Sequence, residues 1–382
     1  MIFTLEALQA EFGDSLLLHY GPDDSPKHIL IDGGPDGVYK NTLRKRLEEL
    51  RAESAGNQLV LQMVMVSHID RDHITGIISL TDELIGKKEA GQQLPYKVIK
   101  LWHNSFDDFI KTKAEVLSAA LDSAIQPAAA GEDFPINLSI NPSSVAVVAD
   151  VKQGRTLRDN AKKLSIQPNA PFKNVVVAPA KGKKEVDMGS GLKLTVIGPN
   201  QQRIEDLQKD WDATIEKLKL AKDAEVAEAI AADFLDKSVP NLSSIVVLAE
   251  SGGKTMLLTG DARGDDVLSG LRTCGLLTDG KLHVDLLKLP HHGSDRNVST
   301  DFFRAITADN YVISANGKNG NPDLPTLKMI SEARGQSKFT IHLTNKEARL
   351  EKFFADEKEK GKKYKAVFRK PTALFIPVKL GS

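Results

Sequence analysis

Four side chains that can bind a metal ion lie within six residues of this sequence: His68, Asp70, Asp72 and His73. The residues before them, 59–66, form an apolar run typical of a buried strand, and residues 74–80 have the apolar spacing of the first turns of a helix. The charged segment therefore lies between a strand and a helix, where an α/β sheet exposes functional groups at the carboxyl end of a strand. This order of elements favours an α/β fold.

The donor atoms of this segment indicate the kind of ion it could bind. Imidazole nitrogen and carboxylate oxygen together suit zinc, manganese or iron(II) better than calcium or magnesium. A polar loop whose histidines cap the following helix is the other interpretation. The metal site is favoured, because a bound cation would neutralise charged groups that are otherwise costly to hold between two apolar elements.

The composition is that of a globular protein, with 382 residues of which 41% are hydrophobic and 27% charged. Lys+Arg and Asp+Glu both number 51, so the net charge predicts no general attraction to nucleic acid or to an anionic membrane. No apolar stretch approaches the length of a membrane span, and no signal peptide is recognisable, so we expect a cytoplasmic protein without membrane contact. The single cysteine, Cys274, excludes an intrachain disulfide and predicts a small buried side chain.

Strand and helix patterns alternate along most of the chain. A helix is expected at 40–51, and strands are predicted at 14–20, 28–31, 59–66, 98–102, 244–250, 255–259, 284–289, 311–315, 338–343 and 366–378. We expect one domain, residues 1–382, with helical insertions at about 105–165 and 201–240. The second insertion is rich in Lys, Glu, Asp and Ala, which is typical of a solvent-exposed helix.

Five segments resemble, in the same order, the motifs of the metallo-β-lactamase superfamily. Residues 30–34 resemble its first motif, and residues 68–73 are a variant of its HxHxDH motif in which Asp70 replaces the second histidine. Residues 257–261 resemble the segment that carries a metal-bridging aspartate, residues 286–294 the last histidine motif, and residues 314–319 a later loop.

This combination is typical of the metallo-β-lactamase domain of bacterial competence DNA-uptake channels and of the soluble hydrolases related to it. The resemblance extends from Leu5 to about Leu324. It implies a four-layer αβ/βα metallo-β-lactamase fold with a helical insertion over or beside the cleft.

The resemblance also implies a site for two divalent metal ions, Zn²⁺ or Mn²⁺. The implied ligands are His68, Asp70, Asp72, His73, Asp261 and His292. The first two would bind one ion and the next two the other, with Asp261 bridging both ions and His292 completing the second site. Asp72, Asp261 and His292 are also the implied catalytic residues, because a hydroxide between two ions becomes available when the pKa of bound water falls from 15.7 toward ~7.

Three further residues are placed near this site. His291 would lie outside the ligand set or face the substrate, and Asp32 would hold a ligand histidine by a hydrogen bond. A histidine of the superfamily pattern is missing, since His103 is the only histidine between His73 and Asp261 and comes early. We expect it not to bind a metal directly, although its place at a strand end leaves a metal or supporting role open. A first site with few donors would favour manganese or another oxygen-tolerant ion.

Candidates for substrate contact are Lys288, Ser294, Ser314, Asn316 and Lys318, because their loops should meet the metal ligands at one edge of the sheet. For Lys288, a side chain that merely extends to solvent is the other interpretation. Asn321 stands where the uptake-channel relatives commonly have a histidine, and an amide cannot transfer a proton near neutral pH.

These observations predict a dinuclear metal-dependent hydrolase, first of all a nuclease-like phosphodiesterase acting on nucleic acid or a nucleotide. The substrate class follows from the resemblance alone. A hydrolase of thioesters, lactones or lactams is the alternative within the same class. A non-catalytic binding or scaffold protein with a degraded metal site is the alternative from another class, favoured by the missing histidine and the balanced charge. No feature of the sequence predicts a protein partner or an oligomeric state.

Overall fold

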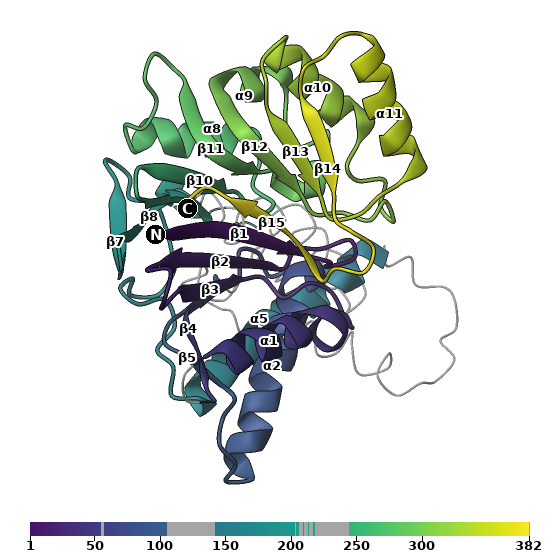
Figure 1. The fold of residues 1–382 in the computed structure, drawn as a ribbon. Helices are drawn as coiled ribbons and strands as arrows, with labels where there is room; N and C mark the ends of the chain where they lie inside the picture. Colours follow the sequence, from purple (N-terminus) through teal and green to yellow (C-terminus); the bar gives the residue numbers. More distant parts are fainter. Residues whose placement is uncertain are drawn as a thin grey trace, which may run out of the picture.

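The computed structural model describes residues 1–54, 57–104, 142–202 and 244–381, together with the isolated positions 204, 205, 209, 213 and 217. Two mixed β-sheets with helices beside them form this part of the chain (Figure 1), so the predicted α/β class is confirmed. Most of the two predicted helical insertions, including residues 106–130, falls outside the described residues. Within the first insertion the structure describes one helix, α5 (Pro142–Lys163).

The first sheet has the strand order β15-β1-β2-β3-β4-β5, and a further strand, β6, also pairs with β4. Its strands are β1 (Ile2–Leu8), β2 (Leu16–Gly21), β3 (Lys27–Ile31), β4 (Leu59–Met65), β5 (Tyr96–Val98), β6 (Leu101–Trp102) and β15 (Phe375–Lys379). The strands from β3 to β6 run parallel, and the others are antiparallel to their neighbours. The carboxyl ends of β3, β4 and β6 therefore lie at one edge of the sheet.

The second sheet has the strand order β14-β13-β12-β11-β10-β9-β8-β7. Its strands are β7 (Lys184–Gly189), β8 (Leu192–Gly198), β9 (Val246–Ser251), β10 (Lys254–Leu258), β11 (Leu282–Lys288), β12 (Ile306–Ile313), β13 (Thr340–Leu343) and β14 (Lys365–Phe368). The strands from β10 to β14 are parallel. In β10, β11 and β12 the last three residues of each strand are buried, so the carboxyl ends of these strands are covered on both faces.

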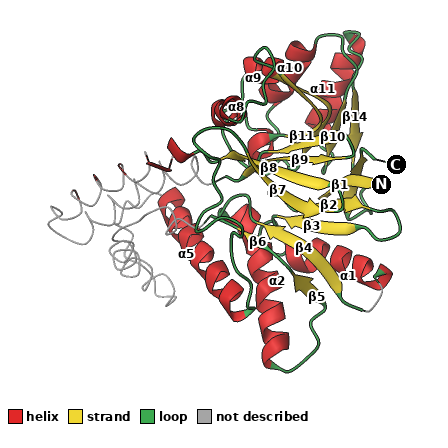
Figure 2. Ribbon diagram, turned by 90° about the vertical axis from the view of Figure 1, so that its left-hand side faces the viewer, coloured by secondary structure: helices red, strands yellow, loops and turns green. Residues whose placement is uncertain are grey.

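Three hydrophobic clusters join the layers. One lies between the two sheets and includes Leu18 and Met65 of the first sheet with Val247 and Leu286 of the second. The other two join each sheet to the helices on its outer face. The helices are α1 (Arg44–Glu53), α2 (Arg71–Glu89) and α5 beside the first sheet, and α8 (Gly264–Thr273), α9 (Thr300–Ala305), α10 (Leu324–Arg334) and α11 (Ala348–Glu359) beside the second. Figure 2 shows the two sheets between the two groups of helices.

Helix α2 positions the metal-capable segment. Ile74, Ile77, Leu80 and Leu84 lie on its buried face, and their spacing of three and four residues is the pattern that predicts a helix after residue 73. The helix begins three residues earlier than predicted, at Arg71, with Asp70 in extended conformation before it. Asp72 and His73 therefore belong to its first turn.

Two predicted strands are each divided in the structure. Residues 98–102 contain the last residue of β5 and the whole of β6, and both of these strands pair with β4. Residues 366–378 form two strands, with β14 at the edge of the second sheet and β15 paired with β1 in the first. A turn at 370–373 separates them, in which the Ala373 amide donates to the Lys370 carbonyl and Pro371 has no amide hydrogen to donate to a ladder. Strands β1, β7 and β8 are present but were not predicted. The first and last strands thus lie side by side, near the two chain ends (Figure 1).

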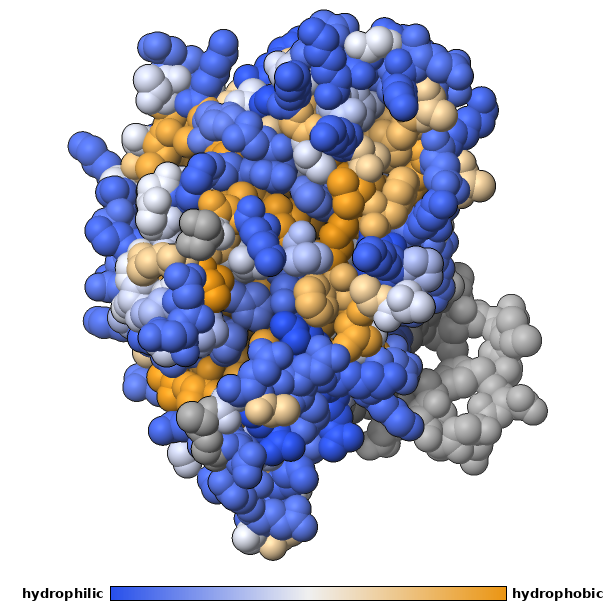
Figure 3. Space-filling view, in the orientation of Figure 1, coloured by the Kyte–Doolittle hydropathy of each residue, from blue (hydrophilic) through white to orange (hydrophobic). Residues whose placement is uncertain are grey.

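Polar residues cover most of the face shown in Figure 3. Among the described residues, the large hydrophobic side chains that are exposed are Met1, Ile99 and Val367. No helix in the described ranges has both the length and the apolar character that crossing a membrane requires.

Candidate metal centre

Backbone hydrogen bonds bring two separate loops to the first turn of α2. The Gly33 amide, after β3, donates to the His73 carbonyl over 2.7 Å, and the Asp14 amide, before β2, donates to the Asp72 carbonyl over 3.1 Å. Gly33 packs so closely on the helix that a Cβ there would collide with the backbone of Gly76 and Ile77. The absence of a side chain at this position allows the end of β3 to touch the start of α2.

The His73 ring lies between two carboxylates. Its Nδ1 atom is 3.0 Å from Oδ2 of Asp32, and its Nε2 atom is 3.3 Å from Oδ1 of Asp261. Asp32 is held in turn by the Ser67 amide at 2.7 Å and the Ser67 hydroxyl at 2.5 Å. The contact of Asp32 with His73 is the one that the sequence suggests, while the role of His73 as a ligand stays a prediction.

His292 faces the same point from the second sheet. It follows β11 in the turn Pro290–Gly293, where both His291 and His292 adopt left-handed backbone angles, with φ of 46° and 54°. The Nδ1 atom of His292 is 3.0 Å from the Ser314 carbonyl, and its Nε2 atom is 3.2 Å from Oδ2 of Asp72 and 3.6 Å from Oδ2 of Asp261. Because a carbonyl can only accept, Nδ1 carries the hydrogen in this contact, and a neutral ring would present the Nε2 lone pair to the carboxylates.

Asp14 belongs to this cluster, and sequence reasoning missed it. The side chain is 1% exposed; its Oδ2 atom is 2.6 Å from the Lys288 ammonium and its Oδ1 atom is 3.4 Å from Nδ1 of His292. Its position two residues before the apolar run at the start of β2 was the available signal, because a charged residue beside a buried apolar segment needs a partner.

Three groups of these side chains could hold a metal ion, each with ligand atoms within 4.8 Å of one another. The groups are Asp72, His73 and His292; Asp14, Asp261 and His292; and Asp14, Asp32 and His73. The number of ions and their identity do not follow from these groups, which share members.

The buried donor atoms fit a cation. The Nε2 atoms of His68, His73 and His292 and the Oδ1 atom of Asp261 are buried and form no hydrogen bond with any residue that the structure describes. A buried polar atom without a hydrogen bond costs free energy. Imidazole nitrogens and carboxylate oxygens are zinc and manganese ligands, so a metal ion between His73, His292 and the carboxylates beside them would give these donor atoms a common partner.

The pKa shifts within the cluster also fit a bound cation. Burial alone would lower the pKa of His292, yet the carboxylates of Asp261 and Asp14 raise it to about 10. Burial likewise opposes the raised pKa of His73, which Asp261 and Asp72 hold well above its usual value. The pKa of Asp261 lies well below its usual value despite burial, because His73 and His292 are close. Protons on the imidazole rings thus offset the negative charge of the carboxylates. A bound metal ion would displace these protons and offset the same negative charge.

His68 and Asp70 form a separate contact at the edge of the cluster. The His68 Nδ1 atom is 3.0 Å from Oδ1 of Asp70, and the His68 and His73 ring centres are 5.8 Å apart. Burial lowers the pKa of His68, but Asp70 and Asp261 raise it to about 9. Asp70 therefore lies beside the cluster, and neither residue is in the three groups found among the described residues.

His103 is also outside those groups within the described part of the chain. It follows β6 and is fully buried, and its backbone amide donates to the Asn169 side chain over 2.9 Å.

His291 is more accessible to solvent than the other histidines near the cluster, because its side chain is 42% exposed. Its Nε2 atom is 3.8 Å from Oδ2 of Asp261, and its Nδ1 atom is 2.9 Å from Oδ1 of Asn297.

The predicted substrate residues divide into buried and exposed groups. Lys288 is 1% exposed and paired with Asp14, so it does not extend to solvent. The Ser314 hydroxyl donates to the Gly13 carbonyl at 2.6 Å, and Ser294 is buried. Asn316 and Lys318 face outward, with the Asn316 amide on Glu11 at 2.9 Å and the Lys318 ammonium 4.3 Å from the centre of the Phe12 ring.

Comparison with known proteins gives one partial similarity. The chain is 24% identical to ComE operon protein 3 of Bacillus subtilis (strain 168) over 139 residues, which are 35% of this chain and 17% of that protein. The chain thus spans a small part of the length of this relative. No protein-family model matches the chain.

Proposed function

We propose that this protein is a metal-dependent hydrolase with the four-layer metallo-β-lactamase fold. The observation that carries the proposal is the convergence of His73 Nε2, His292 Nε2 and Asp261 Oδ1, which are buried and without hydrogen bonds among the described residues. The two face-to-face sheets with outer helices support the fold. The five motifs in order and the partial similarity to ComE operon protein 3 support the same class.

The residues that would hold the metal are those whose donor atoms meet in the cluster: Asp72, His73, Asp261 and His292, with Asp14 and His68 at its edge. We propose two ions, Zn²⁺ or Mn²⁺, with Asp261 between them. When bound, such ions supply a hydroxide at neutral pH and offset negative charge on a phosphoryl or carbonyl oxygen.

The surrounding side chains have supporting roles. Asp32 orients the His73 ring, and the Ser314 carbonyl orients the His292 ring, so that both Nε2 atoms face the cluster. The Asp72 side chain is 20% exposed, so its carboxylate can also accept a hydrogen bond from an attacking water. His291, more exposed and fixed by Asn297, can contact a substrate above Asp261.

We propose a phosphodiester of nucleic acid or a nucleotide as the substrate. The motifs around residues 68–73 and 291–294 support this class through the resemblance. An additional observation is that the Lys318 ammonium and the Phe12 ring lie together, two residues from Asp14. A cation beside an aromatic ring suits a phosphate next to a stacked base.

Metal analysis of the protein purified without chelator, followed by a panel of substrates, tests this function. The panel contains bis-p-nitrophenyl phosphate, single- and double-stranded oligonucleotides, a thioester and a lactam. We expect stoichiometric Zn²⁺ or Mn²⁺ and hydrolysis of the phosphodiesters alone, lost on chelation and restored by metal. Hydrolysis of only the thioester or the lactam would replace the proposed substrate class.

The variant His292→Ala should lose metal and activity, and His283→Ala is its matched control. His283 lies at the start of β11 with its side chain 54% exposed, so its removal should change neither. A wild-type protein without metal and without activity on every substrate would favour the scaffold function instead.

A further inference from the structure

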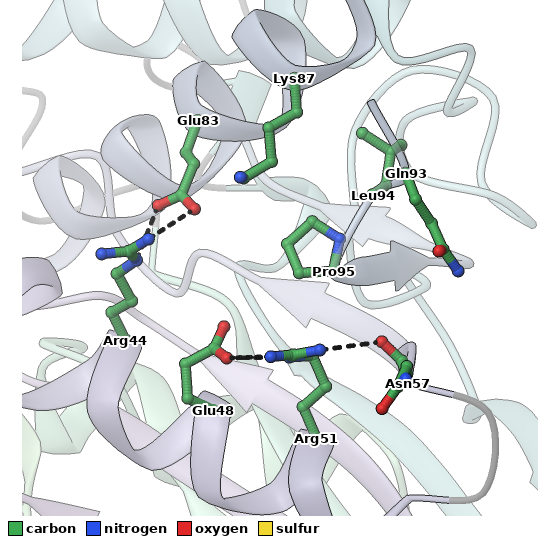
Figure 4. A pocket seen from close by; sticks show the side chains of 9 residues that line it. All are labelled: Arg44, Glu48, Arg51, Asn57, Glu83, Lys87, Gln93, Leu94 and Pro95. Atoms are coloured by element: carbon green, nitrogen blue, oxygen red, sulfur yellow. Dashed lines mark hydrogen bonds and ion pairs between the residues drawn. The ribbon is translucent and has the colours of Figure 1, made fainter. Parts of the chain in front are cut away.

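A cavity lies at the far end of α2 from the candidate metal centre. It has a volume of about 340 Å³ and lies between α1, α2 and the segments before β4 and β5 (Figure 4). Its charged lining consists of Arg44, Glu48, Arg51, Glu83 and Lys87. Lys87 is fourteen residues after His73 on the same helix, which places the cavity roughly 20 Å along the axis from the cluster.

Both carboxylates of the cavity are already bound. Glu83 accepts from Nε and Nη2 of Arg44, at 3.0 and 3.1 Å, and from the Tyr39 hydroxyl at 2.8 Å. Glu48 accepts from Arg51, with 2.7 Å between Nη2 and Oε2, and from the Tyr96 hydroxyl at 2.5 Å. Each glutamate is therefore neutralised by one arginine and held by one tyrosine.

Lys87 is left without a counter-charge in the cavity. It is four residues after Glu83, a spacing at which a glutamate and a lysine on a helix commonly pair, but Glu83 is held by Arg44 and Tyr39. The Lys87 ammonium makes no hydrogen bond or ion pair to the described residues, and Figure 4 shows it directed into the cavity. Three cations and two carboxylates leave the lining with one excess positive charge.

We propose that this cavity binds a small organic phosphate monoester. The Lys87 ammonium offers three donors, and the Nη1 donors of Arg44 are not used by Glu83. Together they suit an anion with several acceptor oxygens. Leu94 and Pro95 form an apolar wall for the uncharged part of the ligand. The volume is at the lower end of the roughly 300–1,000 Å³ of small-molecule sites, which limits the ligand to a small molecule.

Calorimetric titration of the metal-loaded protein with adenosine 5′-monophosphate, inorganic phosphate and adenosine tests the site. We expect the monophosphate to bind, adenosine to bind far more weakly, and added salt to weaken binding. Lys87→Gln should weaken monophosphate binding by about tenfold, since it removes a charged hydrogen-bond donor. Lys45→Gln is the matched control, because it removes the same charge from an exposed position of α1 outside the cavity.

The variant Asp261→Asn separates this site from the metal centre. The proposed site does not depend on the proposed hydrolase function, so the variant should bind the monophosphate as the wild type does. Binding that is lost in Asp261→Asn and kept in Lys87→Gln would assign the ligand to the metal centre and overturn the proposal. Equal affinity for adenosine, or no saturable binding of any phosphate, would also overturn it.

Discussion

Lys288 and Asp14 form an ion pair in the interior, with 2.6 Å between Nζ and Oδ2 and each side chain 1% exposed. The other oxygen of Asp14 is 3.4 Å from Nδ1 of His292. The pair joins the end of β11 to the loop before β2 directly beside a candidate metal ligand, so it contributes to both folding and the geometry of the cluster.

Replacing Lys288 with methionine should destabilise the protein. The variant leaves the Asp14 carboxylate buried without its cation, and loss of one partner of a buried pair typically costs about 3–5 kcal/mol. The free energy of unfolding from urea titration measures this loss. The double variant with Asp14→Leu should regain much of it, because no buried charge then remains unpaired. Lys254→Met, which breaks the solvent-exposed pair with Asp285, is the control and should have little effect. Equal effects of the two methionine variants would contradict the role given to Lys288.

Asp72→Ala and His73→Ala should each abolish hydrolysis while the protein stays folded. Both residues lie in the first turn of α2 and direct polar atoms into the cluster, so their loss removes donors rather than apolar contacts. Turnover and circular dichroism measured together check this, with His283→Ala as the control. Near-normal turnover of either variant in the presence of metal would rule out the proposed mechanism.

Asp261→Asn should lower the content of both metal ions together. Asp261 lies between His73 and His292. Its Oδ1 atom is 3.3 Å from Nε2 of His73 and its Oδ2 atom is 3.6 Å from Nε2 of His292, so its negative charge is close to both rings. Metal content by mass spectrometry of the purified variants measures this effect. The matched control is Asp279→Asn, at an exposed turn with φ of 50°, where asparagine is well tolerated. Loss of a single ion would show that Asp261 does not bridge.

His103→Ala should leave metal stoichiometry unchanged and reduce activity only modestly. His103 is buried at the end of β6 and belongs to none of the metal-capable groups that the described residues form. Titration of zinc and manganese into the wild type and the variant distinguishes the roles. Even a supporting residue typically costs about 10–100-fold in affinity when removed, and a direct ligand costs more. Selective loss of one metal would make His103 a ligand.

Stability should fall between pH 7 and pH 5 because of His28. This ring is paired with His19 across β2 and β3, with 2.8 Å between the Nδ1 atoms. Burial, and then His19, lower the pKa of His28 to about 4 from an unfolded value of 6.5. The unfolded chain therefore takes up the proton first, and stability that is full above pH 6.5 decreases as the pH falls toward 4. The loss at pH 5 should be about 2 kcal/mol.

Urea titrations at pH 8 and pH 5 test this expectation. His28→Gln keeps a polar partner for His19 without a titrating ring, so the variant should lose less stability on acidification than the wild type. His283→Ala, an exposed histidine, should behave as the wild type. An identical pH dependence of His28→Gln and wild type would exclude His28 as the source.

The sequence predicted the α/β class and the segments whose side chains converge, because the strand before His68 and the apolar face of α2 are local patterns. Asp14 could not be recognised in this way, since its partners Lys288 and His292 are more than 270 residues away in the chain and meet it only when the two sheets pack. The same packing buries Lys288, although a lysine at a strand end commonly extends to solvent. Pro371 is a local signal for a break between β14 and β15, but the sheet that β15 joins could not be recognised locally, because its partner β1 lies at the other end of the sequence.

The return of β15 to the first sheet affects synthesis of the chain. Strand β1 leaves the ribosome well before its partner β15, because β1 ends at Leu8 and β15 begins at Phe375. While the residues between them are synthesised, one edge of β1 has unpaired backbone groups that could pair with another nascent chain. The first sheet therefore reaches its native width only after β15 has been made, and a factor that shields β1 until then would increase the yield of folded protein.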